Sequence, residues 1–220
     1  MTPQHAAQKP KPKPKPIRVM CVEDHPLMRM GITTMISRQD DMESIAAVST
    51  AEEALPLALS LSPDIMLVDL RLPKMSGHDL IRTLSKEAPQ IRTIVLTMYQ
   101  GDEDIFRALE AGAVTCLLKD SLADELVEVI RAVARGERPK PPAVERALVE
   151  RSTHETLTGR ELEVSALIVK GLRNKEIATQ LGITEETAKA HVKNIRAKLG
   201  VNDKMSIIPI VVRRGIVHLE

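Results

Sequence analysis

Short apolar runs alternate with helical patterns between residues 17 and 136. The runs are continuously apolar, as in parallel strands that are buried on both faces. Between them apolar side chains recur at the spacing of one helix face, for example at Met28, Ile32, Met35 and Ile36. Five β–α units in about 120 residues predict a doubly wound parallel sheet of the flavodoxin-like kind. The predicted strands are Ile17–Val22, Ser44–Val48, Ile65–Val68, Ile91–Thr97 and Val114–Leu118.

After residue 158 strand-like runs stop, and the pattern predicts an all-α domain of short helices. Asn174 and Thr184 are the expected N-caps of two of these helices, and Gly182 is the expected end of the first. Two helices joined by a short turn with glycine predict a helix-turn-helix. Three pairs along the chain have the spacing of capping boxes: Thr50 with Glu53, Ser121 with Asp124 and Thr158 with Glu161.

A final helix is expected after Asp203, with an apolar face that includes Met205, Ile208 and Val211. Pro209 falls six residues past this expected N-cap and therefore beyond the first turn. There the ring removes a hydrogen bond and clashes with the preceding turn. The sequence thus predicts a helix that is kinked at Pro209 or that starts near it, since proline suits the first turn of a helix.

Two further segments lie outside these domains. Residues 1–16 end in alternating lysine and proline, which predicts an extended, disordered tail. Residues 137–154 contain three prolines among charged residues, with a short helical stretch at 143–150, and we interpret them as a linker. The expected domains are therefore residues 17–136 and residues 155–220.

Composition limits the class of protein. A length of 220 residues suits two domains, and with one Phe, one Tyr and no Trp both cores must be aliphatic. No stretch has the roughly 18 apolar residues of a membrane helix, and the N-terminus lacks the apolar core of a secretory signal, so no membrane association is expected. Cys21 and Cys116 lie inside apolar runs, which argues against a disulfide and favours a reducing cytoplasm.

The net charge of +1 hides an asymmetry between the two halves. Residues 17–136 hold 12 Lys and Arg against 19 Asp and Glu, a net charge of −7. Residues 152–220 hold 11 against 8, a net charge of +3. An acidic half and a basic half indicate different partners: cations for the first, and a polyanion such as DNA for the second.

Polar side chains stand where the predicted strands end. Glu23 and Asp24 follow the first strand, Asp69 ends the third, Thr97 ends the fourth and Lys119 follows the fifth. Because the carboxyl ends of parallel strands meet at one edge of a sheet, we expect these five residues to converge. Carboxylate oxygens suit Mg²⁺, and a carboxylate can accept a phosphoryl group. A hydroxyl and an ammonium can bind the phosphoryl oxygens.

The stretches VEDHPLMRMGI, DIMLVDLRLPKMSG, IVLTMY and AGAVTCLLKD resemble the receiver domain of response regulators, over nearly all of residues 17–136. The resemblance implies that Asp69 is the phosphoacceptor. It also implies two groups of site residues: the Mg²⁺ ligands Asp24, Asp69, the carbonyl of Arg71 and, through water, Glu23; and the phosphate-binding pair Thr97 and Lys119.

Two positions depart from the family pattern. Cys116 stands where the family usually has Tyr or Phe, which rotates as part of the switch, and Tyr99 is the candidate ring nearby. Lys119 is followed by Asp120, whereas many members have proline there. The change at Cys116 supports an alternative, a phosphorylation-independent DNA-binding regulator that uses the receiver only for dimerisation.

The second helix of the predicted helix-turn-helix carries two stripes. Residues 187–200 include four Lys or Arg and no acidic residue, while Glu185 and Glu186 stand in the first turn, where the helix dipole favours them. Such a helix packs by one stripe and presents the other to the major groove of DNA. The buried stripe is expected at Ala188, Val192, Ile195 and Leu199, and the cationic one at Lys189, Lys193 and Arg196.

The sequence LTGRELEVSALIVKGLRNKEIATQLGITEETAKAHVKNIRAKLG strongly resembles the LuxR-type domain of the NarL/FixJ subfamily of response regulators. The resemblance implies that Lys189, Ala190 and Lys193 face base edges. It further implies contacts to phosphates, or positions near them, for Asn174, Lys175, His191, Asn194 and Arg196.

These features predict a two-component response regulator rather than an enzyme. A sensor histidine kinase is expected to phosphorylate Asp69 with Mg²⁺, and the modification is expected to control DNA binding and transcription, with a homodimer formed after phosphorylation. The competing enzyme class is a phosphoaspartate phosphatase of the haloacid dehalogenase type. That class needs its nucleophilic Asp after the first strand and a second Asp two residues later, and Glu23-Asp24-His25-Pro26 offers no such pair.

Overall fold

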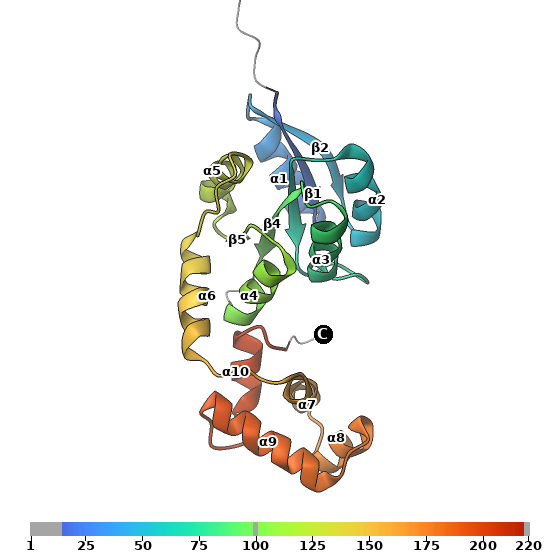
Figure 1. The fold of residues 1–220 in the computed structure, drawn as a ribbon, viewed down its shortest axis with the longest axis vertical. Helices are drawn as coiled ribbons and strands as arrows, with labels where there is room; N and C mark the ends of the chain where they lie inside the picture. Colours follow the sequence, from blue (N-terminus) through green and yellow to red (C-terminus); the bar gives the residue numbers. More distant parts are fainter. Residues whose placement is uncertain (1–14, 99–100, 218–220) are drawn as a thin grey trace, which may run out of the picture.

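The computed structural model describes residues 15–98 and 101–217 (Figure 1). An α/β domain precedes an all-helical domain, as the sequence pattern predicts. The strands are β1 (Ile17–Val22), β2 (Met42–Val48), β3 (Ile65–Asp69), β4 (Arg92–Thr97) and β5 (Thr115–Leu118). The helices are α1 (Pro26–Ser37), α2 (Ala51–Leu61), α3 (Gly77–Glu87), α4 (Asp102–Ala111), α5 (Leu122–Ala134), α6 (Pro142–Thr153), α7 (Gly159–Val169), α8 (Asn174–Leu181), α9 (Glu185–Leu199) and α10 (Ile207–Arg213).

The sheet has the order β2-β1-β3-β4-β5, and each neighbouring pair is parallel, which confirms the predicted doubly wound fold. Every residue of the central strand β3 is buried, because helices cover both of its faces. Met66 and Val68 belong to the core shared with α2, α3 and α4, whereas Ile65 and Leu67 belong to the core shared with α1 and α5. The strand ends differ from the predicted ones by at most two residues.

The helix starts follow the predicted caps only in part. The hydroxyls of Thr50, Thr158 and Thr184 accept hydrogen bonds from backbone amides three residues later, as predicted. The capping box predicted at Ser121 is wrong. The backbone of Ser121 has ψ near 2° instead of the extended conformation of a typical N-cap, and its hydroxyl donates to the carbonyl of Leu118 instead.

The segment interpreted as a linker contains α6, which lies alongside α4 in Figure 1. Val144 and Ala147 of α6 are each 2% exposed and share a core cluster with Ala108 of α4 and Cys116 of β5. Pro142 stands in the first turn of α6, where its missing N–H is harmless. The helix is therefore packed on the α/β domain along its length rather than crossing solvent between two domains.

The final helix, α10, begins at Ile207, so Pro209 is its third residue. The amides of a first turn have no intrahelical partner, and proline is tolerated there. Of the two predicted outcomes, a start near Pro209 is thus confirmed. The N-cap of α10 is Ser206, so the prediction that Asp203 occupies this position is wrong. Asp203 caps the turn that leads into the helix, because its carboxylate accepts a 2.9 Å hydrogen bond from the amide of Ser206, three residues later.

Both domains have aliphatic cores, as the composition requires. Across residues 15–98 and 101–217, no helix is long and apolar enough to span a membrane. The predicted tail, residues 1–16, lies almost entirely outside the described residues.

Candidate functional site

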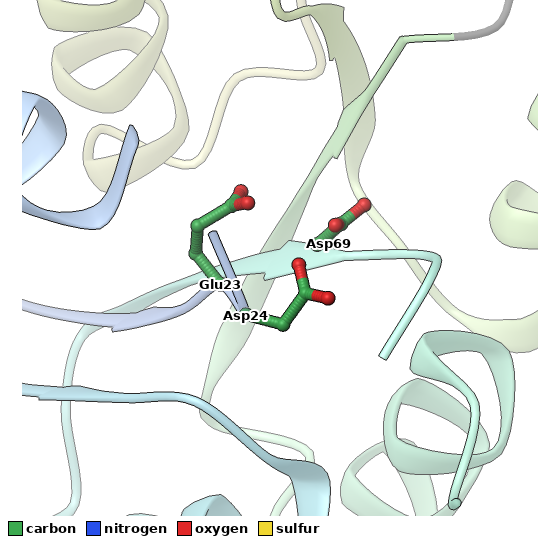
Figure 2. Close-up of side chains that lie close together, drawn as sticks. All are labelled: Glu23, Asp24 and Asp69. Atoms are coloured by element: carbon green, nitrogen blue, oxygen red, sulfur yellow. The ribbon is translucent and has the colours of Figure 1, made fainter. Parts of the chain in front are cut away.

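Three carboxylates meet at the edge of the sheet where the strands end. Glu23 follows β1, Asp24 comes next, and Asp69 is the last residue of β3, the strand beside β1. Oxygen atoms of the three side chains lie within 4.8 Å of one another, and Figure 2 shows the three side chains close together. Glu23 is fully buried and Asp69 is 6% exposed, but Asp24 is exposed. The cluster therefore opens to solvent on the side of Asp24.

Lys119 joins two of these carboxylates. Its Nζ lies 2.7 Å from an oxygen of Glu23 and 2.9 Å from Oδ2 of Asp69, and only 7% of the lysine side chain is exposed. The backbone amide of Lys119 donates a 2.8 Å hydrogen bond to the carbonyl of Thr97, a buried residue at the end of β4. The structure thus brings the predicted strand-end residues to one edge of the sheet.

Burial and charge shift the pKa values in this cluster. Burial raises the pKa of Glu23; the hydrogen bond from Lys119 opposes this shift and the charge of Asp69 adds to it. Burial by itself lowers the pKa of Lys119, but hydrogen bonds to Glu23 and Asp69 and their charges outweigh it and leave the pKa above its ordinary value. Lys119 is therefore a cation at neutral pH and can neutralise an anionic group at Asp69.

The donor set fits a divalent cation. With the acids ionised, three carboxylates and one ammonium leave a net charge of −2. Oε2 of Glu23 is buried and accepts no well-angled hydrogen bond from any described residue, although the Lys119 ammonium is close. Oxygen ligands suit Mg²⁺, which usually keeps several waters, and the exposed Asp24 leaves room for them.

Two residues that the sequence reasoning missed hold this edge of the sheet in place. The guanidinium of Arg29 in α1 donates to the carbonyls of Glu23 (2.6 Å) and Asp24 (3.3 Å). Gly77 begins α3 so close to β3 that a Cβ there would clash with the carbonyl oxygen of Asp69. The sequence signal for this close approach is a glycine at a helix start, a short loop after the acid that ends a strand. No sequence signal indicates the role of Arg29.

The remaining predicted switch residues have mixed placements. Cys116 is 1% exposed and shares a core cluster with Ala108 of α4, and burial raises the pKa of its thiol to about 12. The backbone amide of Arg71 donates a 3.2 Å hydrogen bond to Oδ1 of Asp69, so this residue lies beside the carboxylate. Tyr99 lies outside the described residues.

The helix-turn-helix formed by α8 and α9 presents a polar, basic face. Ala188, Val192 and Ile195 of α9 are buried in the core of the second domain, which confirms the predicted packing stripe. The predicted DNA-contacting residues that are exposed are Lys175, Lys189, Ala190, Lys193 and Asn194.

Two of the predicted DNA-contacting residues on α9 make local contacts. Lys189 pairs with Glu185 one turn earlier (2.9 Å), and both side chains are largely exposed. The guanidinium of Arg196 donates to the backbone carbonyl of Asn202, which holds it against the loop after the helix. His191 is half-buried.

The start of α8 differs from the prediction. Asn174 is the first residue of the helix, and the N-cap is Arg173, whose backbone is extended. The amide of Arg173 donates a 2.6 Å hydrogen bond to the side chain of Glu176. The side-chain oxygen of Asn174 accepts a 3.1 Å hydrogen bond from Lys204, which also donates to the carbonyl of Leu172. The prediction that Asn174 caps the helix is therefore wrong, because Glu176 supplies the cap instead.

Two family models match the two domains. The response regulator receiver domain matches residues 19–131, and the bacterial regulatory proteins of the luxR family match residues 155–211. A nitrate/nitrite response regulator protein homolog of Haemophilus influenzae is 39% identical over 195 residues, covering 86% of this chain and 93% of the relative. The transcriptional regulatory protein LiaR of Bacillus subtilis is 38% identical over 196 residues, with the same shares of each chain.

Solved structures give the same picture. The response regulator ChrA of a heme-sensing two-component system is 32% identical, with a TM-score of 0.56 over 91% of this chain and 98% of that one. A structure of two RcsB dimers bound to two parallel DNAs has a TM-score of 0.68 over 90% of this chain and 99% of that one; at 22% identity it supports the fold alone. The chain belongs to the two-component response regulators that join a receiver domain to a LuxR-type DNA-binding domain, and it is a transcriptional regulator rather than an enzyme.

Proposed function

We propose that Asp69 accepts a phosphoryl group from a sensor histidine kinase. The observation that carries this proposal is the solvent-open carboxylate cluster, in which the ammonium of Lys119 lies 2.9 Å from Asp69. In the reaction an oxygen of Asp69 forms a bond to the phosphorus of a phosphohistidine. The nitrogen–phosphorus bond breaks, the electron pair stays on the imidazole, and Asp69 carries an acyl phosphate.

The surrounding residues have separate roles in this proposal. Asp24, Asp69 and the carbonyl of Arg71 would hold Mg²⁺, with Glu23 assisting through water. The ion would neutralise charge on the phosphoryl oxygens. Lys119 neutralises a further oxygen. In the sheet register Asp69 pairs with Leu96, so Thr97 stands one residue beyond that pair, at the same edge of the sheet as Asp69. From there its hydroxyl can donate to the phosphoryl group. Cys116 and Tyr99 complete the set of proposed switch residues.

In the second domain we assign DNA contact to α8 and α9. Lys189, Ala190 and Lys193 read base edges in the major groove, and a phosphorylated homodimer binds two half-sites about one helical turn apart. The cysteines, buried and free of disulfides among the described residues, favour the cytoplasm as its location. The remaining proposed contacts, to phosphates or near them, are Asn174, Lys175, His191, Asn194 and Arg196.

Labelling with acetyl phosphate and Mg²⁺, read on a Phos-tag gel, tests the proposal. Asp69→Asn abolishes the shifted band, and Asp24→Ala reduces it strongly because a metal ligand is lost. Asp40→Asn changes an exposed carboxylate outside the cluster and serves as the matched control, with labelling equal to wild type. Full labelling of the Asp69→Asn protein would refute the assignment.

The same gel distinguishes the proposal from the alternative of a phosphorylation-independent regulator. The observation that favours this alternative is the buried Cys116, which stands in place of an aromatic ring. If wild-type protein binds DNA but takes no label from acetyl phosphate or from a histidine kinase, the receiver acts only as a dimerisation module. A labelled protein whose DNA affinity rises with the label establishes phosphorylation control.

A further inference from the structure

Lys204, in the loop between α9 and α10, reaches back to the start of α8. Its ammonium donates a 2.7 Å hydrogen bond to the carbonyl of Leu172 and a 3.1 Å hydrogen bond to Oδ1 of Asn174. Leu172 lies in the turn between α7 and α8, and Asn174 is the first residue of α8. One side chain that lies outside the helix-turn-helix therefore holds the residues where that motif begins.

The hydrogen-bond partners of Lys204 are neutral. Its side chain is half-buried, and burial lowers the pKa of the ammonium, an effect that the charge of Glu176 opposes. Lys198, a partly buried lysine of the same domain, has a carboxylate partner, because its Nζ lies 2.7 Å from an oxygen of Glu161. Within residues 15–98 and 101–217, Lys204 has no such ion pair and donates only to a carbonyl and an amide oxygen. Removing an ammonium from water without a counter-ion is unfavourable, so the role of Lys204 lies in the two oxygens that it binds.

The contact with Lys204 fixes the orientation of the Asn174 amide. An ammonium can only donate hydrogen bonds, and the amide nitrogen of asparagine can only donate as well. The amide oxygen must therefore face the lysine, and the two N–H groups must face away from it. Without the ammonium the amide could turn over, and its oxygen would then stand where the donors are now.

Donors at this position suit a phosphate of the DNA backbone. Asn174 and the exposed Lys175 stand in the first turn of α8, where the helix dipole and the free backbone amides favour an anion. A phosphate oxygen accepts hydrogen bonds, and it would be repelled by an amide oxygen. The orientation that Lys204 imposes is therefore the one in which Asn174 can bind a phosphate.

We propose that Lys204 is a positioning residue for DNA binding, which turns the donors of the Asn174 amide toward a backbone phosphate and does not itself contact DNA. The inference rests on the proposed function, because it takes α8 to lie against the DNA backbone. It extends that function to a residue beyond α9, in a loop that carries none of the proposed contacts. Phosphate contacts position a protein on the duplex, so Lys204 contributes to affinity on any sequence rather than to base preference.

The orientation of the amide is tested first, without DNA. The chain has three asparagines, so full-length protein with isotope-labelled asparagine gives three pairs of side-chain amide signals in nuclear magnetic resonance spectra: Asn174, Asn194 and Asn202. The pair that is missing from the Asn174→Ala protein belongs to Asn174. We expect Lys204→Met and Lys204→Ala, which both remove the ammonium, to shift this pair and to leave the Asn194 pair in place. Lys204→Arg keeps donors at the same position and restores the signal toward its wild-type place, and Lys170→Met, at an exposed lysine of the same domain, is the matched control.

A double-mutant cycle then tests the effect on DNA binding by full-length protein, with circular dichroism to establish that each variant is folded. Lys204→Met and Asn174→Ala are each expected to weaken binding to selected duplexes about fivefold for each bound chain, the effect of one lost hydrogen bond. The double variant binds within about twofold of Asn174→Ala alone, because the lysine acts through the amide. Random duplexes lose the same factor, while Lys204→Arg and Lys170→Met bind as the wild type does.

An Asn174 amide signal that stays in place when the ammonium is removed overturns the positioning role. Losses that multiply in the double variant, with a salt dependence reduced by about one contact, overturn it as well, because Lys204 then binds a phosphate itself. If the signal shifts but Asn174→Ala binds DNA like the wild type, the assignment of Asn174 to the DNA backbone fails, and the role of Lys204 in DNA binding fails with it. The amide measurement uses neither DNA nor phosphorylation, so failure of the contact is distinguishable from failure of the proposed function.

Discussion

At the scale of single residues, Lys119 decides whether the carboxylate cluster is stable. Its ammonium lies between the carboxylates of Glu23 and Asp69, and all three side chains are at least nine-tenths buried. Without the ammonium, the two carboxylates would face each other in a poorly hydrated environment. Breaking a buried pair by removing one partner costs more than the pair contributes when intact, because the remaining charge is left unpaired. The same position also makes Lys119 the residue that would neutralise a phosphoryl oxygen on Asp69.

We therefore expect Lys119→Met to lower the free energy of unfolding by about 3 kcal/mol in the absence of divalent cations. A divalent cation takes over the missing positive charge, so Mg²⁺ stabilises the variant more than it stabilises the wild type. Urea unfolding with and without Mg²⁺ measures both effects, and Lys86→Met, at an exposed lysine of α3, is the control. Equal Mg²⁺ effects on the variant and the wild type would show that the cluster is not the metal site.

At the scale of elements, the sequence predicts features that local pattern determines and misses features that tertiary contacts determine. The continuous apolar runs located the strands of the sheet within two residues, because burial on both faces leaves little choice of residue. The stripe of Ala188, Val192 and Ile195 likewise located the buried face of α9. The predictions fail where tertiary or neighbouring contacts determine the structure. The hydroxyl of Ser121 donates to the carbonyl of Leu118 instead of capping α5, and α6 packs on a face that no local pattern identifies.

The residues of the candidate site also fall into a predicted group and a missed group. Strand-end position was enough to predict that Glu23, Asp69 and Lys119 converge, because in a parallel sheet the carboxyl ends share one edge. The support from Arg29 depends on the path of a loop. The pairing of Asp102 with Arg214 joins residues 112 positions apart in different domains, and no periodicity in the sequence relates them.

For α9 we expect base-reading and phosphate-contacting residues to separate by their salt dependence. Lys189→Ala or Lys193→Ala costs roughly 1–3 kcal/mol of binding to selected DNA and relaxes sequence preference. Arg196→Ala weakens binding to all sequences alike and flattens the salt dependence by about one contact. Fluorescence anisotropy on selected and random duplexes at several salt concentrations measures this, with Lys170→Ala, exposed at the end of α7, as control. Equal losses for all three variants on both duplexes would mean that α9 is docked differently.

At the scale of the whole molecule, the charge asymmetry has two uses. The acidic half concentrates carboxylates at the strand ends, where they suit a cation, and also at the start of α4, where Asp102 and Glu103 hold cations of α6 and the second domain. The basic half presents exposed lysines on α8 and α9, and its Arg214 pairs with Asp102 of the receiver. A modification that adds negative charge at Asp69 therefore acts on a molecule whose two halves are already held together by opposite charges.

If phosphorylation of Asp69 acts on the contact between the two domains, the distance between the domains must change. With dyes on cysteines introduced at Ser60 and Gln180, two exposed positions in different domains, acetyl phosphate and Mg²⁺ lower the energy-transfer efficiency of the wild type and leave that of Asp69→Asn unchanged. A ligand or modification shifts an equilibrium only by its differential interaction with the two states. An Asp69→Asn response as large as that of the wild type would place the effect outside the carboxylate cluster.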